Sequence, residues 1–167
     1  ALKNAKLIMK KTKCDAVKLE GGKKIISVVK NLVKNKIPVM GHLGILPQTA
    51  KKFTFKGKKL AERSRILNDA KLLEGAGIFS VVLECVETKL AKKISNQLKI
   101  PTVGIGSSVS CDGQVLVIDD LIGLSQSKFR FVKKYANISK IIDNAVKKYK
   151  SDVLKKKFPI AKHSFRN

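Results

Sequence analysis

The chain has 167 residues, of which 44% are hydrophobic and 29% are charged, and its formal net charge is +24. This length and balance suit a single domain with its own core, and they exclude a disordered tail. The longest apolar runs, such as "FSVVL", are far shorter than the roughly 18 residues that cross a bilayer, so we expect no membrane-spanning segment.

Short apolar strands alternate with longer amphipathic helices along the chain. We expect five strands, at "DAVKLEG" (15–21), "IPVMGHLG" (37–44), "IFSVVLE" (78–84), "IPTVGIG" (100–106) and "QVLVIDD" (114–120). Between and after them we expect four helices, at residues 23–35, 60–77, 87–99 and about 131–157. A loop rich in lysine and glycine lies near residues 51–58, and Gly75 and Gly77 are expected to end the second helix.

Strands that are nearly continuous in Val, Ile and Leu are typical of parallel sheets. Two α/β architectures fit this pattern, an open doubly wound sheet or part of a (β/α) barrel. The stretch "LEGGKK" after the first strand lacks the GxGxxG spacing of a dinucleotide-binding sheet. A closed barrel needs eight strands, so either three strand–helix units are missing or the sheet is open. Because the first residue is not methionine, we expect the missing units upstream, in a longer protein.

Polar or flexible residues stand at the carboxyl end of every expected strand, where barrel enzymes place their chemistry. They are Lys18 and Glu20, His42, Glu84, Gly104 and Gly106, and Asp119 and Asp120. In "VKLEGG", Lys18 and Glu20 are two residues apart and therefore share one face of the strand. They form either a simple ion pair or a site in which Glu20 binds Mg²⁺ and Lys18 binds an anionic substrate group.

Three further features leave alternatives open. Glu84 ends an apolar strand, and it is either a proton acceptor whose pKa is raised by burial or a salt-bridged carboxylate. His42 either donates a hydrogen bond to a substrate or satisfies a polar site in the core. The "GIGSS" loop at residues 104–108 either binds an anion or is only a turn.

The positive charge raises a competing hypothesis, a basic nucleic-acid-binding module. Against it, the basic residues are 32 lysines and only 4 arginines, aromatic residues make up 5%, and the lysines are spread along the whole chain. Three widely separated cysteines, Cys14, Cys85 and Cys111, form no CxxC pair and are expected to be reduced thiols. With no secretory signal at the start, we expect a cytoplasmic protein.

Several stretches in this order resemble the ketopantoate hydroxymethyltransferase family. They are "VKLEGG", "IPVMGHLGILPQT", "DAKLLEGAGIFSVVLECV", "LAKKISNQLKIPTVGIG", "DGQVLV", "DLIGL", "FVKKY" and "FPIAKHSF". The resemblance covers about residues 2–165. It implies a (β/α)₈ TIM barrel of the phosphoenolpyruvate/pyruvate-binding type, of which this single domain, residues 1–167, would hold strands four to eight.

The resemblance also implies an activity, the transfer of a hydroxymethyl group from 5,10-methylenetetrahydrofolate to 3-methyl-2-oxobutanoate with the help of Mg²⁺. Carried over by motif, Glu20 is expected to bind the metal, Lys18 to contact the oxo acid, and Glu84 to accept the proton, with His42 lining the pocket. The partners implied are these small molecules and further copies of the chain in a ring-like decamer, with neither nucleic acid nor a membrane. A related oxo-acid lyase or mutase on the same kind of barrel is a further alternative.

The sequence departs from the family pattern in four places. Two aspartates that hold the metal and the oxo acid in the family would lie before residue 1, so we expect this chain alone to be inactive. The loop "KKFTFKGKK" lacks a Gly-Gly-Tyr, "GIGSS" has two serines where the family usually has Ala-Gly, and Ser127-Lys128-Phe129 replaces Pro-Lys-Phe.

Overall fold

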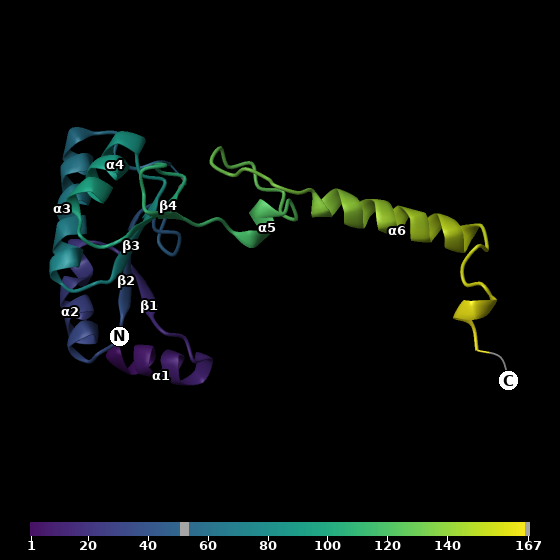
Figure 1. The fold of residues 1–167 in the computed structure, drawn as a ribbon, viewed down its shortest axis with the longest axis horizontal. Coiled ribbons are helices and arrows are strands. Elements are labelled where there is room, and N and C mark those ends of the chain that lie inside the picture. The colour runs from purple at the N-terminus through teal and green to yellow at the C-terminus, as the bar shows by residue number, and fades with distance from the viewer. Residues whose placement is uncertain (51–53, 166–167) are drawn as a thin grey trace. The chain divides into compact units, whose positions relative to one another are not determined.

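The computed structural model describes residues 1–50 and 54–165, and the chain divides into two units, Ala1–Val115 and Leu116–Asn167 (Figure 1). Positions 51–53 of the lysine- and glycine-rich loop lie outside the described residues. No helix in the described part of the chain is long and apolar enough to cross a bilayer. The three cysteines are free thiols.

The first unit is built on a five-stranded sheet in which every pair of neighbours is parallel. The strands are β1 (Val17–Glu20), β2 (Val39–Gly44), β3 (Ser80–Glu84), β4 (Thr102–Ile105) and β5 (Gly113–Gln114). Their order in the sheet is their order in the chain. A doubly wound sheet reverses its strand order at a switch point, whereas successive units of a barrel follow one another, so the observed order is compatible with part of a barrel. The α/β class and the parallel sheet expected from the sequence are therefore confirmed.

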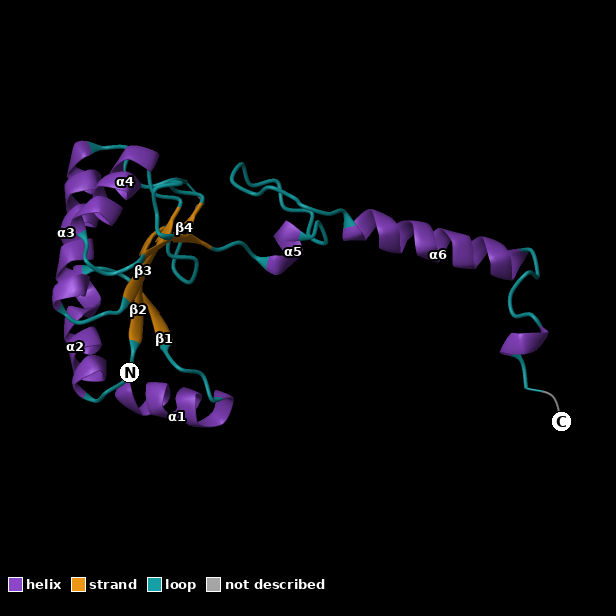
Figure 2. Ribbon diagram, in the orientation of Figure 1, coloured by secondary structure: helices purple, strands orange, loops and turns teal. Residues whose placement is uncertain are grey.

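Helices pack against one face of this sheet (Figure 2). They are α1 (Leu2–Thr12), α2 (Ile26–Lys34), which follows the 3₁₀ turn η1 (Lys23–Ile25), α3 (Leu60–Gly75) and α4 (Thr88–Gln97). The side chain of Glu87 caps α4 by accepting hydrogen bonds from the amides of Lys89 and Leu90, at 3.1 and 2.9 Å. Helix α3 ends at Gly75, as expected from the sequence. Gly77, two residues later, adopts a φ of 94°, a conformation that favours glycine.

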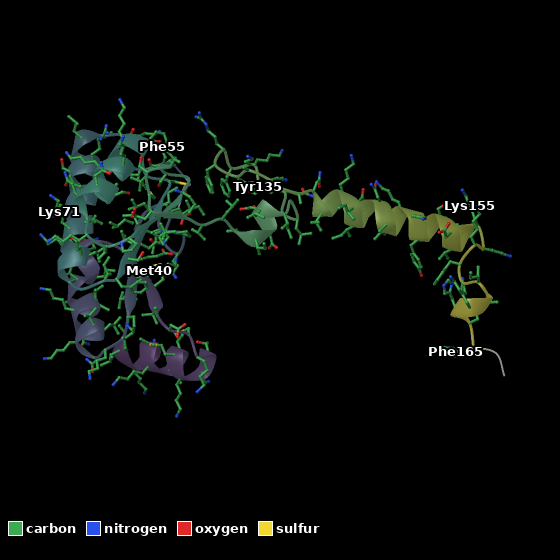
Figure 3. All side chains as sticks on the ribbon, in the orientation of Figure 1. Met40, Phe55, Lys71, Tyr135, Lys155 and Phe165 are labelled. Carbon is green, nitrogen blue, oxygen red and sulfur yellow. The ribbon has the colours of Figure 1, made fainter. Side chains whose placement is uncertain are left out.

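The hydrophobic core lies between the helices and this face of the sheet. Residues with less than 2% of their surface exposed come from α2, β2, α3, β3 and α4: Val29, Leu32, Val39, Ala70, Leu73, Val81, Leu83, Ala91 and Ile94. Burial of each aliphatic side chain of Val, Leu or Ile size contributes about 1.5–3 kcal/mol. Lysines take the opposite, solvated positions, as Lys71 does on the outer side of α3 (Figure 3).

Two elements of the first unit differ from expectation. Helix α1 was not expected, although Leu2, Ala5 and Met9 follow helical spacing and pack on the core. The expected fifth strand over residues 114–120 is wrong beyond Gln114, because the chain leaves the sheet there and residues Ile118–Leu121 form the short helix α5 of the second unit. Asp119 and Asp120 therefore lie in a helix and do not end a strand.

The second unit contains α5, the long helix α6 (Ile138–Leu154) and the 3₁₀ turn η2 (Ala161–His163). Helix α6 begins later than the expected residue 131, because the side chain of Asn137 accepts a hydrogen bond from Lys140 N and caps the helix there. It carries the expected apolar stripe, yet no residue of the helix is buried. Ile141 and Tyr149, for example, are 61% and 59% exposed.

Candidate active site at the carboxyl ends of the strands

The candidate site lies on the face of the sheet opposite the hydrophobic core. Side chains alternate along a strand, and Val17 and Leu19 of β1 pack on the core. Lys18 and Glu20 therefore point to the other face. The same alternation places His42 of β2 and Glu84 of β3 there, because their neighbours Leu43 and Leu83 belong to the core. The parallel register sets Glu20 beside His42, and Glu84 beside Gly44 two residues further along β2.

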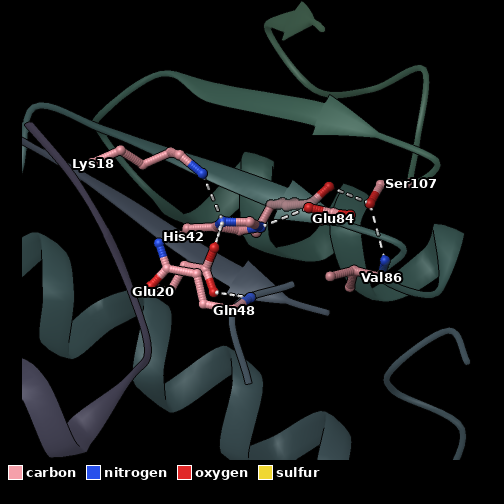
Figure 4. Close-up of polar contacts among 8 residues, drawn as sticks. Lys18, Glu20, His42, Gln48, Glu84, Val86 and Ser107 are labelled. Atoms are coloured by element: carbon pink, nitrogen blue, oxygen red, sulfur yellow. Dashed lines mark hydrogen bonds and ion pairs between the residues drawn. The ribbon is translucent and has the colours of Figure 1, made fainter. Parts of the chain in front are cut away.

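His42 is the centre of the site (Figure 4). Its Nδ1 lies 3.1 Å from the Nζ of Lys18 and 3.6 Å from a carboxylate oxygen of Glu20, and its Nε2 lies 3.0 Å from Oε2 of Glu84. The four residues that the sequence analysis singled out are thus brought together.

The imidazole of His42 is neutral at physiological pH. It is only 1% exposed, and burial, reinforced by the positive charge of Lys18, lowers its pKa from 6.5 to about 4. The ammonium of Lys18 can only donate, so Nδ1 is the acceptor and the ring proton sits on Nε2. Although Nε2 is close to Glu84, it has no well-aligned hydrogen-bond partner among the described residues. A buried N–H without such a partner is available to donate to a bound ligand.

Glu84 is the last residue of β3, and 13% of its side-chain surface is exposed. Burial raises the pKa of its carboxyl group, Lys18 acts in the opposite direction, and Glu20 adds to the increase. A carboxyl group with a raised pKa at the carboxyl end of a strand is suited to accept a proton from carbon.

Glu20 ends β1, and its second carboxylate oxygen accepts a hydrogen bond of 3.2 Å from the backbone N–H of Gln48. This contact comes from the loop after β2 and was not anticipated from the sequence. The described residues contain no group of three or more His, Cys, Asp or Glu side chains placed to hold a metal ion. A single hard carboxylate fits Mg²⁺, however, because this ion usually takes only one or two protein carboxylates and completes its shell with substrate and water.

Two glycines allow other segments to approach the strand ends closely. A Cβ on Gly22 would overlap the carboxylate of Asp69 on α3, which accepts a 2.9 Å hydrogen bond from Lys23 N and so fixes the chain just after Glu20. Gly44 has a φ of 101°, and a Cβ there would overlap the carbonyl oxygen of Glu84. Both glycines are therefore needed for the local geometry of the site.

The remaining sequence candidates make hydrogen bonds of their own. In the "GIGSS" loop, the Ser107 hydroxyl bonds the backbone next to Glu84, and the Ser108 carbonyl accepts from the side chain of Gln114 at 2.8 Å. Asp119 O accepts hydrogen bonds from Leu124 N and Ser125 N inside the second unit, so this residue closes a local turn.

An all-parallel sheet with helices on one face and charged side chains at its carboxyl edge defines the class of α/β proteins that bind small ligands at the strand ends. A family model described as ketopantoate hydroxymethyltransferase matches residues 1–161. The chain belongs to this family.

Several curated relatives carry the name 3-methyl-2-oxobutanoate hydroxymethyltransferase. The one from Pelagibacter ubique is 66% identical over 165 residues, which cover 99% of this chain and 64% of the relative. Those from Syntrophus aciditrophicus and Chlorobaculum tepidum are 48% and 47% identical, again over 99% of this chain but only 62% and 61% of the relatives. The chain thus spans a little over three fifths of the length of the relatives it matches.

Proposed function

We propose that this chain is the C-terminal part of a 3-methyl-2-oxobutanoate hydroxymethyltransferase, which transfers a hydroxymethyl group from 5,10-methylenetetrahydrofolate to 3-methyl-2-oxobutanoate and yields 2-dehydropantoate for pantothenate biosynthesis. The observation that carries the proposal is the cluster of Lys18, Glu20, His42 and Glu84 on one face of the sheet, with contacts of 3.0 to 3.6 Å, in a chain of this family.

We place the five strands as the fourth to eighth of a (β/α)₈ barrel and treat residues 1–167 as part of that single domain. The sequential strand order and the helices on one face support this placement. The face that carries the cluster would then line the barrel interior at its catalytic end. The rest of the barrel would come from the length that the relatives have in addition to the residues matched here.

In this proposal Glu84 accepts the proton from the carbon next to the keto group. The C–H bond breaks, its electron pair forms the enolate of the oxo acid, and the enolate carbon then attacks the methylene carbon of the folate donor. Both bonds from that carbon to the folate nitrogens break in the overall reaction, and a water molecule supplies the hydroxyl group of the product. The proton taken from the oxo acid and one proton of the water end on the folate nitrogens, so tetrahydrofolate is the leaving group. Lys18 holds the substrate carboxylate as a point charge. The Nε2–H of His42 donates to a substrate oxygen, which would give this buried donor the well-aligned partner that it lacks among the described residues.

Glu20 is the residue of this chain that would bind Mg²⁺. When bound, the ion supplies a Lewis acid that polarises the keto group and makes the neighbouring C–H more acidic. The backbone N–H of Gln48 orients the Glu20 carboxylate by its 3.2 Å hydrogen bond. Because the relatives are longer than the residues matched here, we place the rest of the barrel and of the site in that additional length, and the proposal includes that the 167-residue chain alone is inactive.

Small molecules are the proposed partners, and nucleic acid is not among them. The alternative of a basic nucleic-acid-binding module is disfavoured, because the lysines are spread along the whole chain and only 4 of the 36 basic residues are arginines. We further propose a cytoplasmic enzyme that assembles from several copies of the chain.

Calorimetric titration of 3-methyl-2-oxobutanoate into the full-length protein, with and without Mg²⁺, tests the proposal. Mg²⁺ should tighten binding to the wild type, and Glu20→Gln should remove most of that effect. Glu74→Gln is the matched control, because the Glu74 carboxylate also accepts hydrogen bonds from backbone N–H groups, those of Lys99 and Ile100, but it does so before the start of β4 and not at the carboxyl ends of the strands. Binding that does not depend on Mg²⁺, or that is equally affected by both variants, would refute the proposal.

A further inference from the structure

The backbone turns sharply directly after the proposed proton acceptor. Glu84 ends β3, and the next residue, Cys85, has a φ of 49°. A residue other than glycine in this left-handed region costs about 1 kcal/mol or more, so the surrounding contacts must hold the turn in place. These contacts therefore determine the position of the Glu84 backbone, from which its side chain extends.

Three of the backbone groups in this turn are bound by other backbone groups. Glu84 O accepts from Ile45 N at 2.9 Å, Cys85 N donates to Ile105 O at 2.8 Å, and Cys85 O accepts from Lys56 N at 2.8 Å. They tie the turn to the loop after β2, to the end of β4 and to the segment before α3.

Two more backbone groups are bound by one side chain (Figure 4). The hydroxyl of Ser107 donates to Leu83 O at 2.6 Å and accepts from Val86 N at 3.0 Å. Leu83 and Val86 flank the pair Glu84–Cys85, so a single oxygen bridges the turn from one side to the other. Ser107 itself follows β4, and its own carbonyl accepts from the Thr88 hydroxyl at 3.2 Å, which anchors it to the start of α4.

We propose that Ser107 is a positioning residue for Glu84, whose hydroxyl fixes the backbone on both sides of the carboxylate and so sets the distance of that carboxylate from the reacting carbon. The inference rests on the proposed function of Glu84 and goes beyond it, because Ser107 acts through the backbone and not on the substrate. Both hydrogen bonds need a hydroxyl, since the oxygen must donate and accept at once. The family pattern usually has alanine at this position, so this support of Glu84 is specific to this chain.

A test in the full-length protein compares Ser107→Ala, Ser107→Thr and Ser95→Ala. Threonine keeps the hydroxyl, whereas alanine leaves Leu83 O and Val86 N without it. Ser95→Ala is the matched control: the Ser95 hydroxyl also makes two hydrogen bonds, to Ala91 O at 3.1 Å and with the Thr102 hydroxyl at 2.8 Å, but on the helical side of the sheet. The measured quantities are kcat, KM for the oxo acid, the thermal midpoint, and the rate of exchange of the substrate's C3 hydrogen with solvent.

We expect Ser107→Ala to lower kcat and the C3 exchange rate about tenfold, because displacement of a catalytic group by even 1 Å costs up to about a hundredfold in rate. KM should stay within about twofold, and Ser107→Thr should recover most of the lost rate. Ser95→Ala should lower the thermal midpoint without lowering kcat. An unchanged kcat in Ser107→Ala, or no recovery in Ser107→Thr, would overturn the proposal.

Crystal structures of the wild type and of Ser107→Ala make the result independent of the enzymatic activity. The Glu84 carboxylate should move away from its position 3.0 Å from His42 Nε2 in the variant. If the wild type lacks transferase activity, the proposed function fails while this displacement still decides the role of Ser107. An unmoved carboxylate would overturn that role, whatever the activity.

Discussion

Neutral His42 makes the stability of this protein depend on pH in a predictable direction. The perturbation is His42→Gln, which keeps a polar side chain of similar length but removes the titrating group. Glu84 lies next to His42, and burial raises the pKa of Glu84, so its contribution to stability has the opposite sign. The comparison is therefore made in a Glu84→Gln background, with and without His42→Gln.

The magnitude follows from the pKa of His42, which is lowered from 6.5 to about 4. Between these values the unfolded chain binds more protons than the folded one, so stability falls as the pH falls from about 6.5 to about 4. At about 1.4 kcal/mol per pKa unit, the loss attributable to His42 is about 3 kcal/mol. The side chain is 1% exposed, so solvent screening reduces this value little.

Urea unfolding followed by circular dichroism, at pH 7, 5.5 and 4 with EDTA present, measures this loss. The Glu84→Gln protein should lose about 3 kcal/mol more between pH 7 and pH 4 than the Glu84→Gln/His42→Gln protein. Parallel loss of stability in the two proteins would refute the reasoning, because it would mean that His42 titrates normally in the folded state.

The remaining predictions concern the glycines at the strand ends. Gly44→Ala should lower the free energy of unfolding by about 2–4 kcal/mol and reduce activity, because alanine at a φ of 101° is strained and its Cβ would overlap Glu84 O. Gly22→Ala should cost about 1–3 kcal/mol in the same urea experiment, since Asp69 must move and release Lys23 N. The control, Gly75→Ala, places a Cβ where nothing lies within 4 Å and should be neutral or stabilising by up to about 1 kcal/mol; equal losses in all three variants would contradict the steric argument.

Most helices and strands of the first unit could be predicted from the hydrophobic pattern. Apolar runs such as "SVVLE" and helical stripes such as Val29 and Leu32 indicate which residues are buried. The gathering of Lys18, Glu20, His42 and Glu84 followed from a general property of parallel sheets, whose carboxyl ends lie at one edge. The first and last residues of the helices and strands were harder to predict from the sequence. The run "QVLVIDD" is as apolar as a strand, yet only Gln114 of this run lies within β5, since pairing depends on distant backbone and not on local composition.

The supports of the site could not be predicted, because they are contacts between segments far apart in the sequence. Nothing in "GGKK" indicates that Asp69, 46 residues from Lys23, would fill the space beside Gly22. Likewise, the two serines of "GIGSS" suggested only an altered loop, whereas the fold gives the hydroxyl of Ser107 two backbone hydrogen-bond partners beside Glu84. The tautomer of His42 depends on the approach of Lys18, which the register of β1 and β2 determines.

Exchange of the C3 hydrogen of 3-methyl-2-oxobutanoate in deuterium oxide, catalysed by the full-length protein with Mg²⁺ and without folate, tests the assignment of Glu84 most directly. The wild type should catalyse the exchange. Glu84→Gln should abolish it while Mg²⁺-dependent binding of the oxo acid remains within a few-fold of the wild type, because the amide keeps the shape of the carboxylate but cannot accept the proton. Exchange that persists at the wild-type rate in Glu84→Gln would contradict the account.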